Sequence, residues 1–271
     1  MPGAGSGCGE LGAELAREAR LRRLVDLEAA VAPGRHARRD PPRPACRRPR
    51  PLLRRGRGDH PWYAWAVTIP RPYDAVLCDF DGVIRFYDQT ELNELERAMG
   101  LAEGTTTKVV FAPEVDRPVL LGQITVEQWM ETAEAALALQ VPREQARALV
   151  TAFVKAPARV DDDVLGLLRR AQEHVPVVLV TNATLDLEDD LAWLGLTHFA
   201  DEVVSSALVG VGKPDARIYE IAAERAGVPL GRCLFVDDRE ENVEAARALG
   251  MTAVLFTGVP DLEAALAPLL G

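Results

Sequence analysis

Short apolar runs alternate with amphipathic segments along the chain from about residue 73 onward. The run at residues 175–180, VPVVLV, is almost wholly apolar, which is typical of a strand buried on both faces. Strands that alternate with helices of about 10–15 residues indicate a parallel α/β sheet. The predicted strands are residues 75–78, 175–180, 202–205, 233–236 and 252–256, and the predicted helices are residues 161–173, 186–194, 214–226 and 241–249, with Pro214 in a first turn.

Residues 88–156 interrupt this alternation, because their pattern predicts helices and no strand. In the segment 125–139, apolar residues recur at helical spacing, and we interpret Trp129 and Met130 there as core rather than as substrate contacts. The predicted fold class is therefore α/β, a Rossmann-like parallel sheet flanked by helices, with a small α-helical domain inserted. The predicted helices of the insertion are residues 91–99, 125–139 and 142–154, and the predicted α/β core is residues 73–87 and 157–271.

Residues 1–66 differ in composition from the rest. Residues 1–60 hold 14 Arg, no Lys and 7 acids, a balance of +7, so the remaining chain must carry −17 to give the total of −10. Residues 10–31 have helix-forming composition, but residues 32–61 are rich in Pro and Arg and lack hydrophobic periodicity, which predicts disorder.

Three interpretations of this extension are open. It is a solvated tail, or a basic arm for an anionic surface or nucleic acid, or it is not native and translation begins near Val67. Because aromatic residues do not interleave with the arginines, we expect no nucleic-acid partner. A peptide from residues 1–60 in the native protein would contradict the third interpretation.

The four cysteines, Cys8, Cys46, Cys78 and Cys233, match no zinc spacing and no dense disulfide framework. Cys78 and Cys233 lie in or beside apolar runs, so we expect both to be buried thiols in a reducing cytoplasm. No apolar stretch approaches the ~20 residues that span a bilayer, and we expect no membrane partner and no secretory signal.

Oxygen-bearing side chains follow three of the predicted strands. Ligands of parallel α/β sheets bind at the carboxyl ends of the strands, so we expect these side chains to converge. Converging carboxylates repel one another, and hard oxygen ligands point to Mg²⁺, which usually shares its site with a substrate phosphate. Each pair alone is also compatible with a solvated turn, whereas the combination is specific. The residues are Asp79, Asp81, Thr181, Asn182, Asp237 and Asp238.

A single lysine adds to this group. Lys is rare in the chain, and Lys213 lies in VGKPD, just before a predicted helix, where a cation is slightly unfavourable. Lys213 is better explained if it neutralises a carboxylate cluster that holds a phosphoryl group.

Four motifs in this order resemble the haloacid dehalogenase-like superfamily. They are VLCDFDGVI, VVLVTNAT, GKPD and LFVDDREENVEAARALGM, and the resemblance covers about residues 73–260. One branch of that family places a helical cap between the first two motifs, as the insertion at 88–156 does here.

The resemblance implies a role for each matching residue. Asp79 would be the nucleophile, ionised at its ordinary pKa of ~3.9, and Asp81 the general acid and then base, with its backbone carbonyl on the metal. Strand alternation would place both carboxylates on one side, with Phe80 on the other. Thr181, Asn182 (through its backbone N–H) and Lys213 would bind the phosphoryl group. Asp238 would bind Mg²⁺ directly and Asp237 indirectly, with these two roles interchangeable, and Asn242 would support their loop.

The expected function is Mg²⁺-dependent hydrolysis of a small phosphorylated metabolite. The dehalogenase branch lacks the second Asp, so Asp81 argues against dehalogenation. Two alternatives remain open: a sugar phosphomutase that uses the same residues, and a non-catalytic binding module anchored by the basic arm. Neither the substrate nor the oligomeric state follows from the sequence.

Overall fold

The computed structural model describes residues 71–271. The predictions for residues 1–66, and for Cys8 and Cys46, therefore fall outside the described residues.

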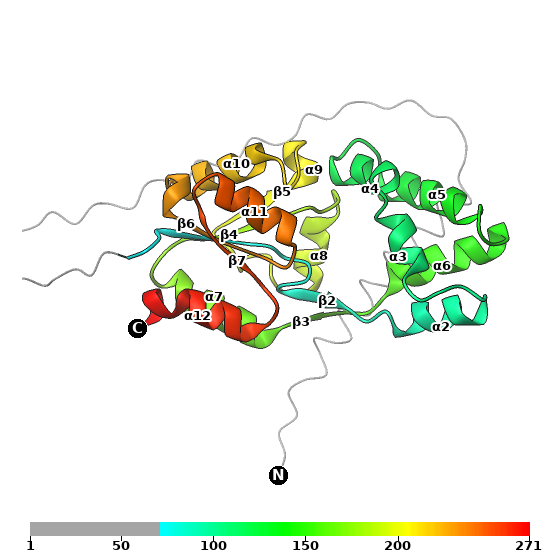
Figure 1. The fold of residues 1–271 in the computed structure, drawn as a ribbon, viewed down its shortest axis with the longest axis horizontal. Coiled ribbons are helices and arrows are strands. Elements are labelled where there is room, and N and C mark those ends of the chain that lie inside the picture. Colours follow the sequence, from blue (N-terminus) through cyan, green and yellow to red (C-terminus); the bar gives the residue numbers. More distant parts are fainter. Residues whose placement is uncertain (1–70) are drawn as a thin grey trace, which may run out of the picture. The chain divides into compact units, whose positions relative to one another are not determined.

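A five-stranded parallel sheet forms the centre of the described chain, in the order β5-β4-β1-β6-β7 (Figure 1). In β1, Val76 pairs with Val177 on one side and with Leu234 on the other. The predicted α/β class is thus confirmed. The strands are β1 (Ala75–Cys78), β4 (Val177–Thr181), β5 (Glu202–Ser205), β6 (Cys233–Asp237) and β7 (Thr252–Leu255).

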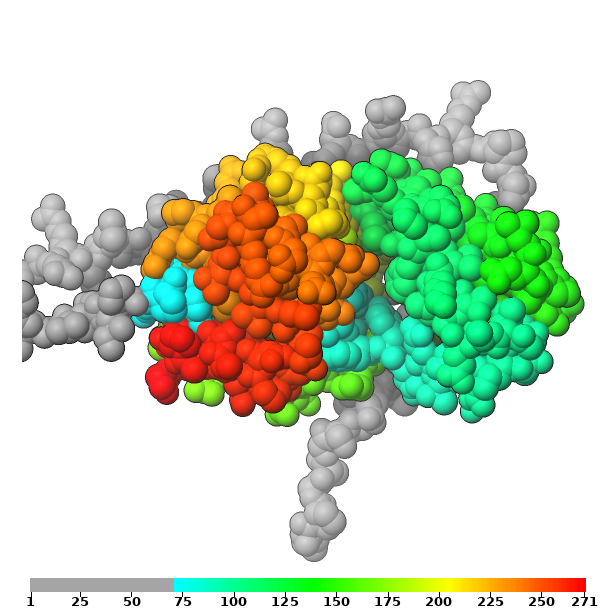
Figure 2. Space-filling view, in the orientation of Figure 1, coloured from blue at the N-terminus to red at the C-terminus, as the bar shows by residue number. Residues whose placement is uncertain are grey.

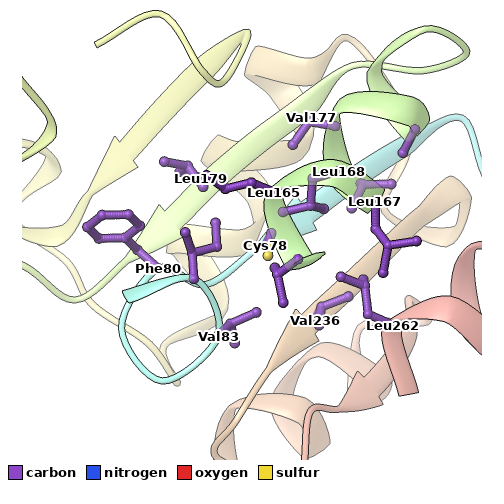
Figure 3. Packing of buried hydrophobic residues seen from close by; sticks show 14 of the residues in the cluster. Cys78, Phe80, Val83, Leu165, Leu167, Leu168, Val177, Leu179, Val236 and Leu262 are labelled. Carbon is purple, nitrogen blue, oxygen red and sulfur yellow. The ribbon is translucent and has the colours of Figure 1, made fainter. Parts of the chain in front are cut away.

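Helices cover both faces of the sheet (Figure 1). Side chains alternate along β1, so Val76 and Cys78 join one apolar cluster while Ala75 and Leu77 join the other. The first cluster includes residues of α7 (Asp162–Gln172), α8 (Leu187–Trp193) and α12 (Val259–Leu270). Figure 3 shows Cys78 in this cluster with Leu165 and Leu168 of α7. The second packs against α10 (Ala216–Ala226) and α11 (Glu240–Ala248).

Cys78 and Cys233 are buried free thiols, and burial raises the pKa of both. Within the described residues, no helix is long and apolar enough to cross a membrane.

Helix α12 and the start of helix α10 differ from the sequence prediction. Helix α12 was not predicted, because Pro260 and Pro268 lie within its sequence; it packs on α7, and the Tyr73 hydroxyl donates to the Ala265 carbonyl at 2.6 Å. The prediction for Pro214 was wrong: α10 begins at Ala216, because the Asp215 side chain accepts from the Arg217 N–H and caps the helix.

The segment between the first two motifs is helical and has its own apolar core. It leaves the sheet through β2 (Arg85–Tyr87) and returns through β3 (Ala158–Val160), which pair antiparallel. Trp129 is 7% exposed and belongs to this core, as expected. The helices are α2 (Thr90–Ala98), α3 (Thr105–Val110), α4 (Pro113–Leu120), α5 (Val126–Leu137) and α6 (Arg143–Lys155).

Helix α4 of this segment contacts α9 (Ser206–Val209) of the sheet-bearing part, and the green and yellow surfaces meet in Figure 2. Gly122, just after α4, has a φ of +67° and lies so close to the Ala207 carbonyl that an added Cβ would collide with it. The close approach thus depends on the absence of a side chain at residue 122.

Candidate active site

The carboxyl ends of three neighbouring strands bring the predicted site residues together. Asp79 follows β1, while Thr181 and Asp237 are the last residues of β4 and β6. Since β1 lies between β4 and β6 and all three are parallel, these residues share one edge of the sheet.

Lys213 bridges two of the carboxylates. Its Nζ lies 2.7 Å from Asp79 Oδ1 and 2.7 Å from Asp237 Oδ2. The backbone N–H of Phe80 also donates to Asp79 Oδ1, at 2.7 Å. Among the described residues, both donors to Asp79 thus bind its Oδ1, which leaves Oδ2 for another partner. Lys213 is only 6% exposed, so its charge is compensated by carboxylates rather than by bulk water.

Burial shifts the pKa values of these groups. It raises the pKa of Asp79, and the Asp237 charge adds to the rise while Lys213 opposes it. Burial lowers the pKa of Lys213, but the two carboxylates together raise it by more. The pKa of Lys213 therefore lies above its ordinary value. The sequence does not reveal this burial, so it gave no sign that the pKa of Asp79 lies above its ordinary value.

Three carboxylates have the chemistry and spacing of a metal site. One oxygen each from Asp79, Asp237 and Asp238 lies within 4.8 Å of the others. With the ammonium of Lys213, the group has a formal charge of −2, from three negative charges and one positive. Hard oxygen donors and this negative excess fit a divalent cation such as Mg²⁺.

The two acids after β6 have different surroundings. Asp237 is buried, and its Oδ1 accepts from the Arg239 N–H and from Asn242 Nδ2, both at 2.9 Å. The two oxygens of Asp237 are thus occupied by protein donors, whereas Asp238 is exposed. The contact from Asn242 is the one expected for a residue that supports this loop.

Gly82 permits the approach of Asp238. Its φ is +84°, and a Cβ at this position would collide with the Asp238 carboxylate. The glycine of the first motif therefore serves both the turn and the neighbouring acid.

Thr181 and Asn182 lie at the end of β4 but differ in their bonds. The Thr181 hydroxyl is buried without a hydrogen-bond partner, and the residue is 1% exposed. A buried hydroxyl without a partner is costly, and an oxygen of a bound ligand would supply the missing partner. The Asn182 side chain accepts from the Lys213 N–H at 2.8 Å and donates to the Lys213 carbonyl at 2.9 Å. Sequence reasoning missed both contacts, because the two residues lie far apart in the chain.

Asp81 does not join the carboxylate group. Its two oxygens accept from Arg85 Nε at 2.6 Å and Nη2 at 2.8 Å. Because β1 ends at Cys78 and the chain turns after it, strand alternation does not extend to Asp79 and Asp81. Phe80, by contrast, belongs to the apolar cluster and lies at its edge in Figure 3.

Two supporting residues were not among the predicted site residues. One is Arg85, whose place just after the first motif fitted either the pocket mouth or linker packing; its i,i+4 spacing from Asp81 is a further sequence signal. The other is Ser206, whose hydroxyl accepts from the Ala183 N–H at 3.0 Å and holds the loop after Asn182. Nothing in the sequence around Ser206 indicates this contact.

A sequence profile for haloacid dehalogenase-like hydrolases matches residues 73–250. The chain belongs to this family. The resemblance inferred from its four motifs is therefore confirmed.

Relatives and solved structures agree with this family. Phosphatase MT3486 of Mycobacterium tuberculosis is 31% identical over 197 residues, which cover 67% of this chain and 86% of that protein. Phosphoserine phosphatase of Thermus thermophilus is 33% identical over 116 residues, which cover 41% of this chain and 47% of that protein. A family enzyme of Bacteroides thetaiotaomicron, solved with magnesium and inorganic phosphate, shares the fold: the TM-score is 0.52 at 20% identity, over 68% of this chain and 93% of that one.

Proposed function

We propose that this hydrolase cleaves small-molecule phosphate monoesters with Mg²⁺, through an aspartyl-phosphate on Asp79. The observation that carries the proposal is the buried Lys213 between Asp79 and Asp237, beside the third carboxylate of Asp238. Several similar proteins bear the names of phosphatases, which supports the same reaction class.

Asp79 acts as the nucleophile in the first step. Lys213 and the Phe80 N–H hold its Oδ1, so Oδ2 attacks phosphorus while the ester P–O bond breaks. Asp81 gives a proton to the leaving oxygen. In the second step, Asp81 takes a proton from water as that water attacks phosphorus and the bond to Asp79 breaks.

The phosphoryl oxygens meet donors from the other strand ends. The unpartnered Thr181 hydroxyl, the Asn182 N–H and the Lys213 ammonium would bind them. Asp79, Asp238 and the Asp81 carbonyl would hold Mg²⁺, with Asp237 supporting from behind. When bound, Mg²⁺ supplies positive charge against the phosphate oxygens.

The helical segment 88–156 acts as a cap in this proposal. Its α4 contacts α9, whose Ser206 supports the loop after Asn182. A cap over the site excludes water during the first step and favours small substrates over proteins.

The test compares wild type with Asp79→Asn on p-nitrophenyl phosphate and about a hundred phosphorylated metabolites, with Mg²⁺ or with a chelator. We expect phosphate release by wild type, and its loss in the variant and in the chelator. Asp163→Asn, an exposed acid in the first turn of α7, is the control and should retain activity. Equal activity of wild type and Asp79→Asn would contradict the mechanism, and isomerised sugar phosphate without phosphate release would indicate a mutase.

A further inference from the structure

Arg85 is a buried arginine that the proposed mechanism has not yet used. It is 6% exposed and begins β2, the strand that leads into the helical segment. Its guanidinium holds both oxygens of Asp81 and also donates from Nη1 to Asp190 Oδ2 at 2.9 Å. All three guanidinium nitrogens thus have acidic partners.

Two aromatic rings contact this guanidinium, and a backbone hydrogen bond holds the Arg85 main chain. Its carbon lies 4.6 Å from the centre of the Phe80 ring and 5.0 Å from that of Tyr87. The Gly82 N–H donates to the Arg85 carbonyl at 2.8 Å, which closes the turn between the two residues. Because Phe80 belongs to the main apolar cluster and Asp190 to α8, Arg85 is anchored on the sheet-bearing part.

The position of Asp81 outside the carboxylate group suits a proton-transfer residue. In an in-line displacement the attacking and leaving oxygens lie on opposite sides of phosphorus. The residue that serves the leaving oxygen must therefore lie away from Asp79 and still be held in a definite orientation. A bidentate arginine–carboxylate pair supplies that orientation, because its two parallel bonds fix the plane of the carboxylate.

We propose that Arg85 is a positioning residue for the reaction: anchored by Asp190 and Phe80, it orients Asp81, which as a protonated carboxyl group gives its proton to the leaving oxygen and then, as a carboxylate, takes a proton from water. The inference rests on the proposed phosphatase function. Arg85 itself keeps its protons throughout and does not touch the substrate; its effect acts through Asp81.

The test uses two probes of similar size, p-nitrophenyl phosphate and phenyl phosphate. The p-nitrophenolate anion leaves readily without a proton, whereas phenolate depends on the acid. General acid catalysis contributes about 10²–10⁴-fold. We therefore expect Arg85→Met to lower kcat/KM for phenyl phosphate at least about tenfold more than for p-nitrophenyl phosphate. Arg85→Lys keeps the charge but loses the two parallel bonds. It should also lower kcat/KM for phenyl phosphate more than for p-nitrophenyl phosphate.

Pre-steady-state measurements report the second step. With p-nitrophenyl phosphate, Arg85→Met should release one equivalent of nitrophenol in a burst and then turn over slowly, because water activation also needs an oriented Asp81. Should Arg85→Met fail to fold, Asp190→Asn removes the anchor without touching Asp81 and should shift the probe ratio less, in the same direction.

Arg232 offers a matched control. It holds both oxygens of Asp74 at 2.9 Å, in the same bidentate manner, in a pair at the start of β1 and β6 rather than at their carboxyl ends. Arg232→Lys should have the same ratio of kcat/KM for the two probes as wild type, and the same pre-steady-state release of nitrophenol as wild type. The inference is overturned if folded Arg85 variants lower kcat/KM for both probes by the same factor and show no burst of nitrophenol. A wild-type enzyme inactive toward every phosphate ester would instead contradict the phosphatase function itself.

Discussion

The side chain of Asn182 clamps the backbone of Lys213 through two hydrogen bonds, although 31 residues separate them. Asn182 belongs to the second motif and Lys213 to the third, so the clamp joins two parts of the site that the sequence keeps apart. It fixes the backbone from which the buried ammonium reaches Asp79 and Asp237.

Replacing Asn182 with Ala should therefore affect both activity and stability. Leaving the Lys213 backbone groups without partners should lower the free energy of unfolding by about 1–3 kcal/mol. We expect phosphatase kcat to fall by more than the stability loss explains, because Lys213 loses its fixed position.

Gln172→Ala is the control for this prediction. That side chain also bridges distant segments, since its Nε2 donates to the Phe199 carbonyl at 2.9 Å, but it lies outside the strand-end site. Chemical denaturation and steady-state kinetics on both variants decide the matter: equal kcat in the two would show that the clamp is structural only.

Gly82→Ala should weaken the metal site. The substitution places a Cβ against the Asp238 carboxylate and strains a left-handed backbone, which costs about 1–2 kcal/mol. Isothermal titration should show weaker Mg²⁺ binding in this variant. Gly195→Ala has the same backbone strain, with a φ of +72°, but open space around it, and should bind Mg²⁺ like wild type. Unchanged affinity in both variants would contradict the role given to Gly82.

Gly122→Ala should disturb the docking of the helical segment. A Cβ there would collide with the Ala207 carbonyl, next to the Ser206 that holds the Ala183 backbone. We expect a raised KM for small phosphate esters and faster proteolysis between the segment and the sheet-bearing part. Gly104→Ala shares the left-handed backbone, with a φ of +79°, and has nothing within 4 Å, so it isolates backbone strain from collision. Identical kinetics of the two variants would show that the contact is dispensable.

Asp116 in α4 should make stability depend on pH. Burial raises its pKa from 3.8 to about 6, with Arg239 opposing the rise. Because the folded pKa is the higher one, the contribution of Asp116 to stability is full below about pH 4 and is lost as the pH rises through about 6. Allowing for its partial exposure, the loss at pH 7 is roughly 1–2 kcal/mol.

Asp116→Asn should remove this loss and so stabilise the protein at pH 7 but not at pH 4. Glu114→Gln, an exposed acid on the same helix, makes the same change in net charge and should leave the pH dependence intact. Denaturation curves between pH 4 and 8 test this, and a parallel fall of stability in wild type and Asp116→Asn would contradict it.

Most strands and helices of the described chain followed from local pattern. Residues 202–205 were predicted and observed as β5, and Thr125 and Asp161 cap α5 and α7 where the sequence predicts helix starts. The misses have local causes as well: prolines within α12 concealed a helix, and Asp215 rather than Pro214 marked the start of α10.

The sequence by itself determined the chemistry of the strand ends, because residue type and position after an apolar run are local properties. Only the tertiary structure decided how those groups pair: Asn182 with the Lys213 backbone, Gly82 with Asp238, and Asp81 with Arg85 and its anchor Asp190. Burial and the crossing of distant segments create these pairs. They also set the raised pKa of Asp79, which depends on solvent exclusion and on charges brought close by the fold.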